Sequence, residues 1–179
     1  MDTQVETQVE TPTVQPLKLD YDPLKLTVDQ QACLLARRTA EILAEPAHWM
    51  KGDLARSERG HRVSAINNDA HSFCLLGGME RAAYELGILS QDPNLGPHFI
   101  DTVFANAIYD GRGAIGKVAS AMLKVVQRLG ARSILPPVRF IPDYNDYHAT
   151  THDDIVQVCR ATALEVCVDL PGDECSKGE

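Results

Sequence analysis

The feature that most constrains the fold is the three- and four-residue spacing of apolar side chains along most of the chain. Such spacing places apolar side chains on one face of an α-helix. It occurs in five segments, which begin near Thr27, Ser72, Phe99, Ala114 and Thr151. These segments leave little room for a sheet. The sequence therefore predicts a mainly α fold, a single compact bundle of about five helices with long irregular connections.

Helix boundaries are marked by recognisable capping residues. Thr27, followed three residues later by Gln30, has the pattern of a capping box, in which each side chain bonds the backbone of the other. The second helix is predicted over residues 72–86, ahead of Gly87, and Thr151 is predicted to cap the last helix. Residues 51–69 are polar and indicate a long loop. Residues 132–146 contain three prolines and indicate extended or irregular chain.

The chain divides into a core and two tails. Residues 1–26 are predicted to form a flexible N-terminal arm, residues 27–170 the helical domain, and residues 171–179 a flexible C-terminal tail. The first residues show neither the basic nor the apolar region of a secretory signal, and no apolar run reaches the ~20 residues of a membrane span. The sequence thus favours a cytoplasmic protein that does not associate with a membrane. Five irregularly spaced cysteines favour reduced thiols over a disulfide framework.

The glycine-rich segment 108–118, IYDGRGAIGKV, matches two nucleotide-binding patterns, GxGxxG and GxxxxGK. The first pattern requires a preceding strand, but the residues before it have helical periodicity. The second requires Ser or Thr after the lysine, where this chain has Val118. We therefore predict a turn between two helices, with Gly111 in the left-handed conformation that ends the first.

A basic segment follows this turn. Residues 111–142 contain six basic residues and no acidic one, in a chain of net charge −8. Four of the basic residues are predicted to share one helix face: Lys117, Lys124, Arg128 and Arg132. Such a face suits phosphate, an acidic protein surface or nucleic acid, although the net charge does not favour nucleic acid. The alternative is a solvated helix face balanced by acidic residues of the same protein.

Two pairs of residues have spacings that occur in metal sites, His71 with Cys74 and His148 with His152. Cys74 lies in an apolar stretch and His152 in an acidic helical turn, so we predict no metal and no cofactor. The run from Tyr144 to Tyr147 combines two phenols, an amide and a carboxylate before a helix. A structural turn is the default interpretation, and a pocket or partner surface is the alternative.

Two segments carry a family resemblance, His48 to Ala83 and residues 141–163. They resemble an uncharacterised family of small helical proteins from bacteria and phages with W-x-x-G, C-x-x-G-A and W-N-D motifs. The resemblance covers roughly residues 30–165, with Gly78 in place of the usual Ala and Tyr144 in place of the usual Trp. It implies a fold and a phage or mobile-element origin, and no catalytic residue. It also suggests that a polar cluster converges in the fold, formed by Trp49, Lys51, Arg56, Cys74, Asn145 and Asp146.

The sequence as a whole favours a non-enzymatic accessory or interaction protein. Such a protein would present the basic helix face to an acidic protein partner or to a second copy of itself. The alternative is a small hydrolase or ligand-binding protein that uses the polar cluster together with a cysteine and a histidine. In that case the cluster should line one cleft. The purely structural interpretation is that the same residues form a polar staple that closes the bundle.

Overall fold

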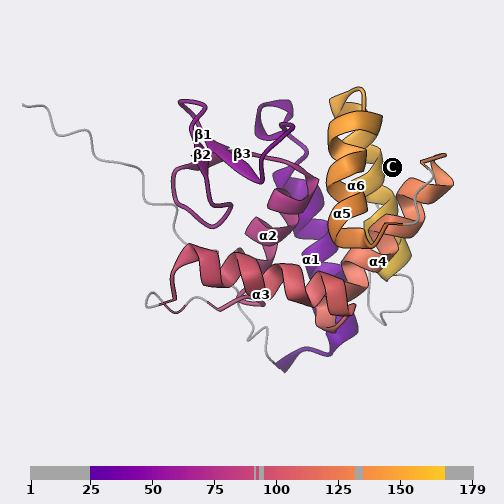
Figure 1. Cartoon of the computed structure of the whole chain (residues 1–179). Coiled ribbons are helices and arrows are strands. Elements are labelled where there is room, and N and C mark those ends of the chain that lie inside the picture. Colours follow the sequence, from indigo (N-terminus) through magenta and orange to yellow (C-terminus); the bar gives the residue numbers. More distant parts are fainter. Residues whose placement is uncertain (1–24, 91, 93–94, 132–134, 168–179) are drawn as a thin grey trace, which may run out of the picture.

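Six α-helices and one small sheet make up the part of the chain that the computed structural model describes, residues 25–90, 92, 95–131 and 135–167 (Figure 1). Of the predicted tails, only residues 25 and 26 are among the described residues, and Arg132 lies outside them. The helices are α1 (Val28–Ile42), α2 (Leu75–Glu85), α3 (Pro97–Asp110), α4 (Gly113–Arg128), α5 (Pro137–Asp143) and α6 (His152–Cys167). The prediction of a compact, mainly α fold is confirmed.

Helices α1 and α4 form the centre of the packing. α1 contacts α2, α4 and α6, while α4 also contacts α3, α5 and α6 (Figure 1). The predicted caps are present at the start of the first helix, α1, and of the last helix, α6. Thr27 and Gln30 form the capping box of α1, and Thr151 Oγ1 accepts a bond from the Asp154 amide at the start of α6. None of the helices within the described residues has both the length and the apolarity that a bilayer span requires.

The segment predicted as a long loop contains a three-stranded antiparallel sheet of order β2-β1-β3. Its strands are β1 (Ala55–Ser57), β2 (Arg62–Val63) and β3 (Ala70–Phe73). Ala55 pairs with Val63 on one side and with Phe73 on the other. The loop prediction is wrong here, and the predicted start of the second helix at Ser72 is early because β3 extends to Phe73. Strands of two to four residues are too short for an alternating pattern to stand out.

The proline-rich segment is helical, which corrects the prediction of irregular chain. Pro136 is extended, as a residue before proline should be, and Pro137 then occupies the first turn of α5. Proline lacks a backbone N–H, and in the first turn of a helix that N–H would have no acceptor within the helix. The chain continues directly into a π-helical turn, η3 (Tyr144–His148), closed by a 2.8 Å bond from the Ala149 amide to the Tyr144 carbonyl.

The turn between α3 and α4 follows the prediction. Gly111 ends α3 with a φ of 66°, the left-handed conformation that glycine adopts most easily. Gly116 packs against this turn so closely that an added Cβ would lie 2.2 Å from the carbonyl carbon of Gly111. The two glycines therefore serve a tight connection between helices.

A disulfide joins Cys33 in α1 to Cys167 at the end of α6. The prediction of reduced thiols is wrong for this pair, because α1 and α6 pack side by side and bring residues 134 positions apart within bonding distance. Cys74 and Cys159 are buried free thiols. Cys175 lies outside the described residues.

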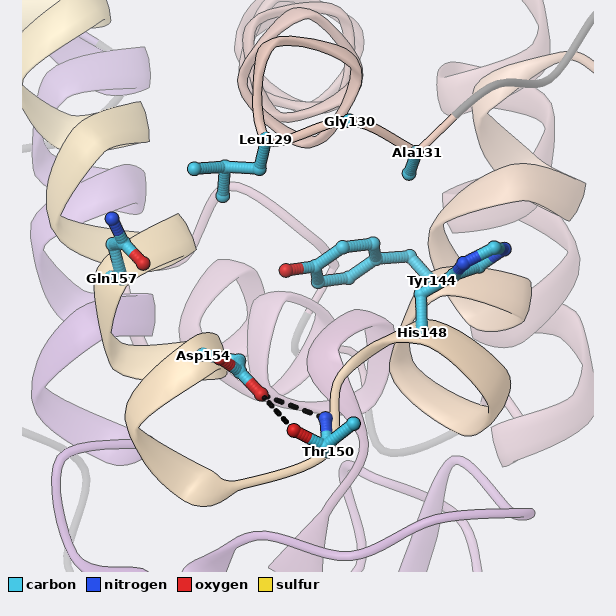
Figure 2. A pocket seen from close by; sticks show the side chains of 8 residues that line it. All are labelled: Leu129, Gly130, Ala131, Tyr144, His148, Thr150, Asp154 and Gln157. Atoms are coloured by element: carbon cyan, nitrogen blue, oxygen red, sulfur yellow. Dashed lines mark hydrogen bonds between the residues drawn. The ribbon is translucent and has the colours of Figure 1, made fainter.

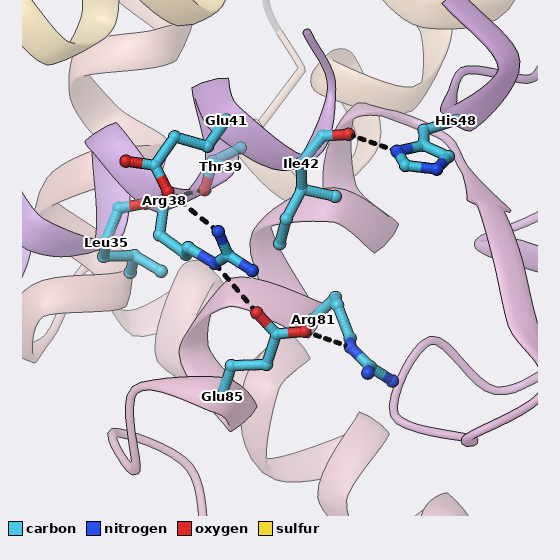
Figure 3. A network of polar contacts seen from close by, with 8 residues as sticks. All are labelled: Leu35, Arg38, Thr39, Glu41, Ile42, His48, Arg81 and Glu85. Atoms are coloured by element: carbon cyan, nitrogen blue, oxygen red, sulfur yellow. Dashed lines mark hydrogen bonds and ion pairs between the residues drawn. The ribbon is translucent and has the colours of Figure 1, made fainter. Parts of the chain in front are cut away.

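A network of ion pairs fastens α2 to α1 and to the loop before β3 (Figure 3). The Glu85 carboxylate accepts from Arg38 of α1 at 2.9 Å and from the buried Arg81 at 2.6 Å. Arg81 also donates to the Asn67 carbonyl at 3.0 Å. Because Arg81 is almost fully buried, its charge depends on this carboxylate.

Candidate functional site

Asn145 is the centre of the polar cluster that the resemblance suggests. Its side chain is fully buried. Its Oδ1 accepts from the Trp49 indole at 2.9 Å and from the Leu75 amide at 3.1 Å, and its Nδ2 donates to the Met50 carbonyl at 3.1 Å. One side chain thus joins three segments: the chain before the sheet, the start of α2 and the π-helical turn.

Asp146 and Lys51 complete the same junction. The Asp146 carboxylate accepts from the Gly52 amide at 2.9 Å. The Lys51 ammonium donates to the Ala149 carbonyl at 2.6 Å and lies 5.6 Å from the centre of the Trp49 ring. These contacts bind the two family segments to each other, so we refer to Trp49, Lys51, Asn145 and Asp146 as the junction cluster.

Cys74 lies beside the junction cluster and Arg56 does not join it. The Cys74 thiol caps α2 by accepting from the Gly77 amide at 3.4 Å. Burial raises the pKa of this thiol to about 11, so it is protonated at neutral pH and a weak nucleophile. The Arg56 guanidinium pairs with Asp53 at 2.7 Å. None of the six predicted cluster residues lines either of the two pockets described below, and the hydrolase alternative gains no support.

The histidines of the two metal-like spacings also have contacts of their own. His71 packs edge-on against His48, with ring centres 5.4 Å apart. His152 Nε2 lies 2.7 Å from the Leu43 carbonyl. Over the described ranges, no group of three or more His, Cys, Asp or Glu side chains is placed to hold a metal ion.

The predicted basic face lies on α4, and its members differ in their partners. Lys117 pairs with Asp29 at the start of α1, and Arg128 pairs with Glu165 of α6 at 2.6 Å. The exposed Lys124 has no ion-pair partner among the residues that the structure describes. Two of the three described cations are therefore balanced by the protein itself, and Lys124 carries the unbalanced charge.

A groove of about 460 Å³ runs beside this face, between α4, the start of α1 and the end of α6. Lys117, Ser120, Lys124 and Glu165 supply its polar wall, and Val28 and Val166 supply apolar surface. The Glu165 carboxylate is paired with Arg128. Gly111 and Gly113 of the interhelical turn also line it. The glycine-rich segment therefore borders a groove without forming the strand–turn–helix of a nucleotide site. Sequence periodicity located the lysines, but the groove depends on how three helices meet.

A second pocket, of about 310 Å³, lies at the opposite end of α4 (Figure 2). It is bounded by the end of α4, the π-helical turn and the first turns of α6. Eight residues line it: Leu129, Gly130, Ala131, Tyr144, His148, Thr150, Asp154 and Gln157. The sequence pointed to Tyr144 as a possible pocket residue and did not point to Asp154 in that role.

Glu80, a fully buried carboxyl group in α2, was not among the residues predicted from the sequence. Neither of its oxygens has a hydrogen-bond partner among the described residues. Burial, and then the neighbouring carboxylate of Asp101, raise the pKa of Glu80 to about 8. Asp101 itself accepts from the Ser64 hydroxyl at 3.1 Å. At neutral pH Glu80 is therefore mostly a neutral acid inside the core.

Replacing Glu80 with Gln is expected to change how stability depends on pH. The pKa of Glu80 in the folded protein is about 8, above the ordinary value of 4.5. The folded state therefore holds this proton more tightly than the unfolded chain does. The stability that this preference contributes is complete below pH 4.5 and is lost as pH rises toward 8. The shift corresponds to roughly 5 kcal/mol at most, and an unpaired buried amide costs about 1–3 kcal/mol. We expect Glu80→Gln to be more stable than wild type by about 2 kcal/mol at pH 8.

Urea unfolding at pH 5 and pH 8 measures this difference in stability, with Glu45→Gln, a change at an exposed residue, as control. Parallel pH profiles for Glu80→Gln and wild type would contradict the neutral buried acid.

Comparison with known proteins places most of the helical domain in one family. A model described as a family of unknown function (DUF6197) matches residues 28–165. This range begins at the first residue of α1 and ends two residues before the disulfide-bonded end of α6. It includes the whole junction cluster and every lining residue of the two pockets except Val166. No curated protein and no solved structure matches the chain.

Proposed function

This chain belongs to the DUF6197 family of unknown function, and from its geometry we propose that it is a non-enzymatic interaction protein. The α4 basic face, formed by Lys117, Lys124 and Arg128 and predicted from the sequence to extend to Arg132, binds an acidic protein segment, on a partner or on a second copy. The observation that carries the proposal is Lys124, an exposed and unbalanced cation beside a groove in a protein of net charge −8.

The groove supports an acidic peptide better than a bare anion. Val28 and Val166 offer apolar contact next to the two lysines, which suits a segment that combines carboxylates with aliphatic side chains. The Lys117–Asp29 pair is surface-exposed, and such pairs contribute only about 0–1 kcal/mol. A carboxylate of the partner can therefore replace Asp29 at small cost. The net negative charge opposes nucleic acid, whose phosphates would be repelled elsewhere on the surface.

Origin and location are part of the same proposal. A phage or mobile-element origin rests on the resemblance of the two family segments. A cytoplasmic location stays a prediction from the sequence. The Cys33–Cys167 disulfide weighs against it, because cytosolic thiols are usually kept reduced.

Charge reversal at Lys124 tests the proposal directly. A fluorescein-labelled oligoglutamate peptide should bind the wild-type protein with an affinity that falls as salt increases. Lys124→Glu should weaken this binding at least about tenfold, because an attractive contact becomes a repulsive one. The matched control is Arg160→Glu, an exposed charge reversal on α6 that should leave the affinity close to wild type.

Two results would reject the proposal. One is equal loss of binding in Lys124→Glu and Arg160→Glu, which would show attraction by net charge alone. The other is binding of an oligolysine peptide as tight as that of oligoglutamate. Light scattering of both variants reports in addition whether the acidic segment belongs to a second copy.

A further inference from the structure

The pocket at the end of α4 combines an aromatic wall with an unpartnered hydroxyl. The Tyr144 ring is 6% exposed and stacks on His148, with ring centres 6.2 Å apart and planes 15° from parallel. Figure 2 shows its phenol pointing across the pocket toward α6. Within the described part of the chain this hydroxyl has no hydrogen-bond partner. The ring is buried while the hydroxyl is open to the pocket, so the pocket offers a polar group that its own walls do not use.

Asp154 supplies a fixed negative charge on the opposite wall. Its Oδ2 accepts from the Thr150 amide at 2.7 Å, the Thr151 amide at 2.8 Å and the Thr150 hydroxyl at 3.0 Å. Hydrogen bonds from the Thr151 and Thr150 amides lower the pKa of Asp154, which keeps it ionised. All of these contacts use one oxygen, so Oδ1 is left for another donor. No Lys or Arg among the described residues pairs with this carboxylate.

The end of α4 adds to the negative potential. Leu129, Gly130 and Ala131 line the pocket at the C-terminus of this 16-residue helix. The last carbonyls of a helix carry the negative end of its dipole and favour a cation. Aromatic faces such as that of Tyr144 also attract cations. Charge, dipole and ring therefore favour the same sign of ligand.

We infer that this pocket binds a small organic cation, an amine or guanidinium compound whose N–H groups donate to Asp154 Oδ1 and the Tyr144 phenol oxygen. The volume of about 310 Å³ is at the lower end of small-molecule sites and suits a ligand smaller than a nucleotide. This site is separate from the α4 basic face, since the two pockets share no lining residue and lie at opposite ends of α4.

Agmatine, which carries one amine and one guanidinium group, is a suitable probe. In a titration followed by amide NMR, we expect saturable shifts at Gly130, Ala131 and Thr150. Asp154→Asn keeps an oxygen for the cap and removes the charge, and it should weaken binding at least about tenfold. Tyr144→Phe keeps the ring and removes the hydroxyl, and it should weaken binding about threefold or more. Asp153→Asn removes an exposed charge from the same helical turn and should bind as wild type does.

The probe also has a neutral counterpart, N-butylurea, which should not saturate the pocket. The inference is overturned if agmatine causes no saturable shifts, if Asp154→Asn and Asp153→Asn bind it equally, or if N-butylurea binds as tightly. Because Asp154→Asn weakens a side-chain cap of α6, the Tyr144→Phe variant, which removes a hydroxyl that makes no capping bond, provides the independent result. Lys124→Glu should bind agmatine normally, so failure of one site is distinguishable from failure of the other.

Discussion

Removing the disulfide between Cys33 and Cys167 is expected to lower the free energy of unfolding by about 4 kcal/mol. The bond joins the first and last helices of the domain and closes a loop of 134 residues. This loop contains helices α2 to α5 and the sheet. Without the bond, the unfolded chain gains the conformational entropy that closing such a loop removes. Guanidinium unfolding of the oxidised and the reduced protein measures the difference.

The double variant Cys33→Ala/Cys167→Ala is the matched control for reduction. It should unfold at the same denaturant concentration with and without reductant, close to the midpoint of the reduced wild type. Among the described residues, burial raises the pKa of the two free thiols, to about 11 for Cys74 and about 12 for Cys159, so neither exchanges readily at neutral pH. A midpoint of the wild type that is unaffected by reductant would show that the bond contributes nothing to stability.

The predictable part of the fold was the part with both periodicity and caps. Helices α1 and α6 begin within one residue of their predicted caps, Thr27 and Thr151. In these helices the apolar stripe and the terminal residues indicate the same boundaries, so each supports the other. The apolar residues of α3 recur at helical spacing (Phe99, Ile100, Val103, Phe104, Ala107 and Ile108), but not all of them are buried. Ile100, Phe104 and Ile108 are buried, whereas Phe99 and Val103 are largely exposed. α3 covers one side of the bundle, so only the side chains on its inner face are buried.

The sheet, α5 and the disulfide depend on tertiary contacts that local patterns do not encode. β1 is stabilised by pairing with β3 across a gap of more than ten residues. The two prolines of α5 lowered its helical propensity, yet Phe140 and Ile141 are buried in the core and hold it in place. Cysteine spacing likewise contained no information about a pair separated by nearly the whole domain.

The candidate site was predictable in composition and not in geometry. The sequence treated Tyr144, Asn145 and Asp146 as one unit with one role. In the π-helical turn these neighbours point in different directions, so Tyr144 lines a pocket while Asn145 binds Trp49. Glu80 offered a missed signal. α2 is small or apolar almost all round, which indicates a buried helix, and a carboxyl group within it should be buried too.

Asn145→Ala is expected to cost about 4 kcal/mol of stability, because it removes at once the four side-chain hydrogen bonds that Asn145 makes with Trp49, Leu75, Met50 and Asp146. The Leu75 amide, the Trp49 indole and the Met50 carbonyl each lose their partner. A buried polar group left unpaired costs about 1–3 kcal/mol. Trp49 is the only tryptophan in the chain, so its fluorescence reports on the cluster directly. We expect an earlier urea midpoint and a red-shifted emission of the native state.

Two further variants separate the junction cluster from general damage to the turn. Tyr147 lies in the same π-helical turn and is 80% exposed, so Tyr147→Ala should change stability by less than about 0.5 kcal/mol. Trp49→Phe removes the indole donor, and combined with Asn145→Ala it should cost less than the sum of the two single changes, because both break the same bond. Strict additivity would show that the bond between Trp49 and Asn145 does not couple the segment before the sheet to the π-helical turn. The family resemblance would then reflect two independently stabilised segments.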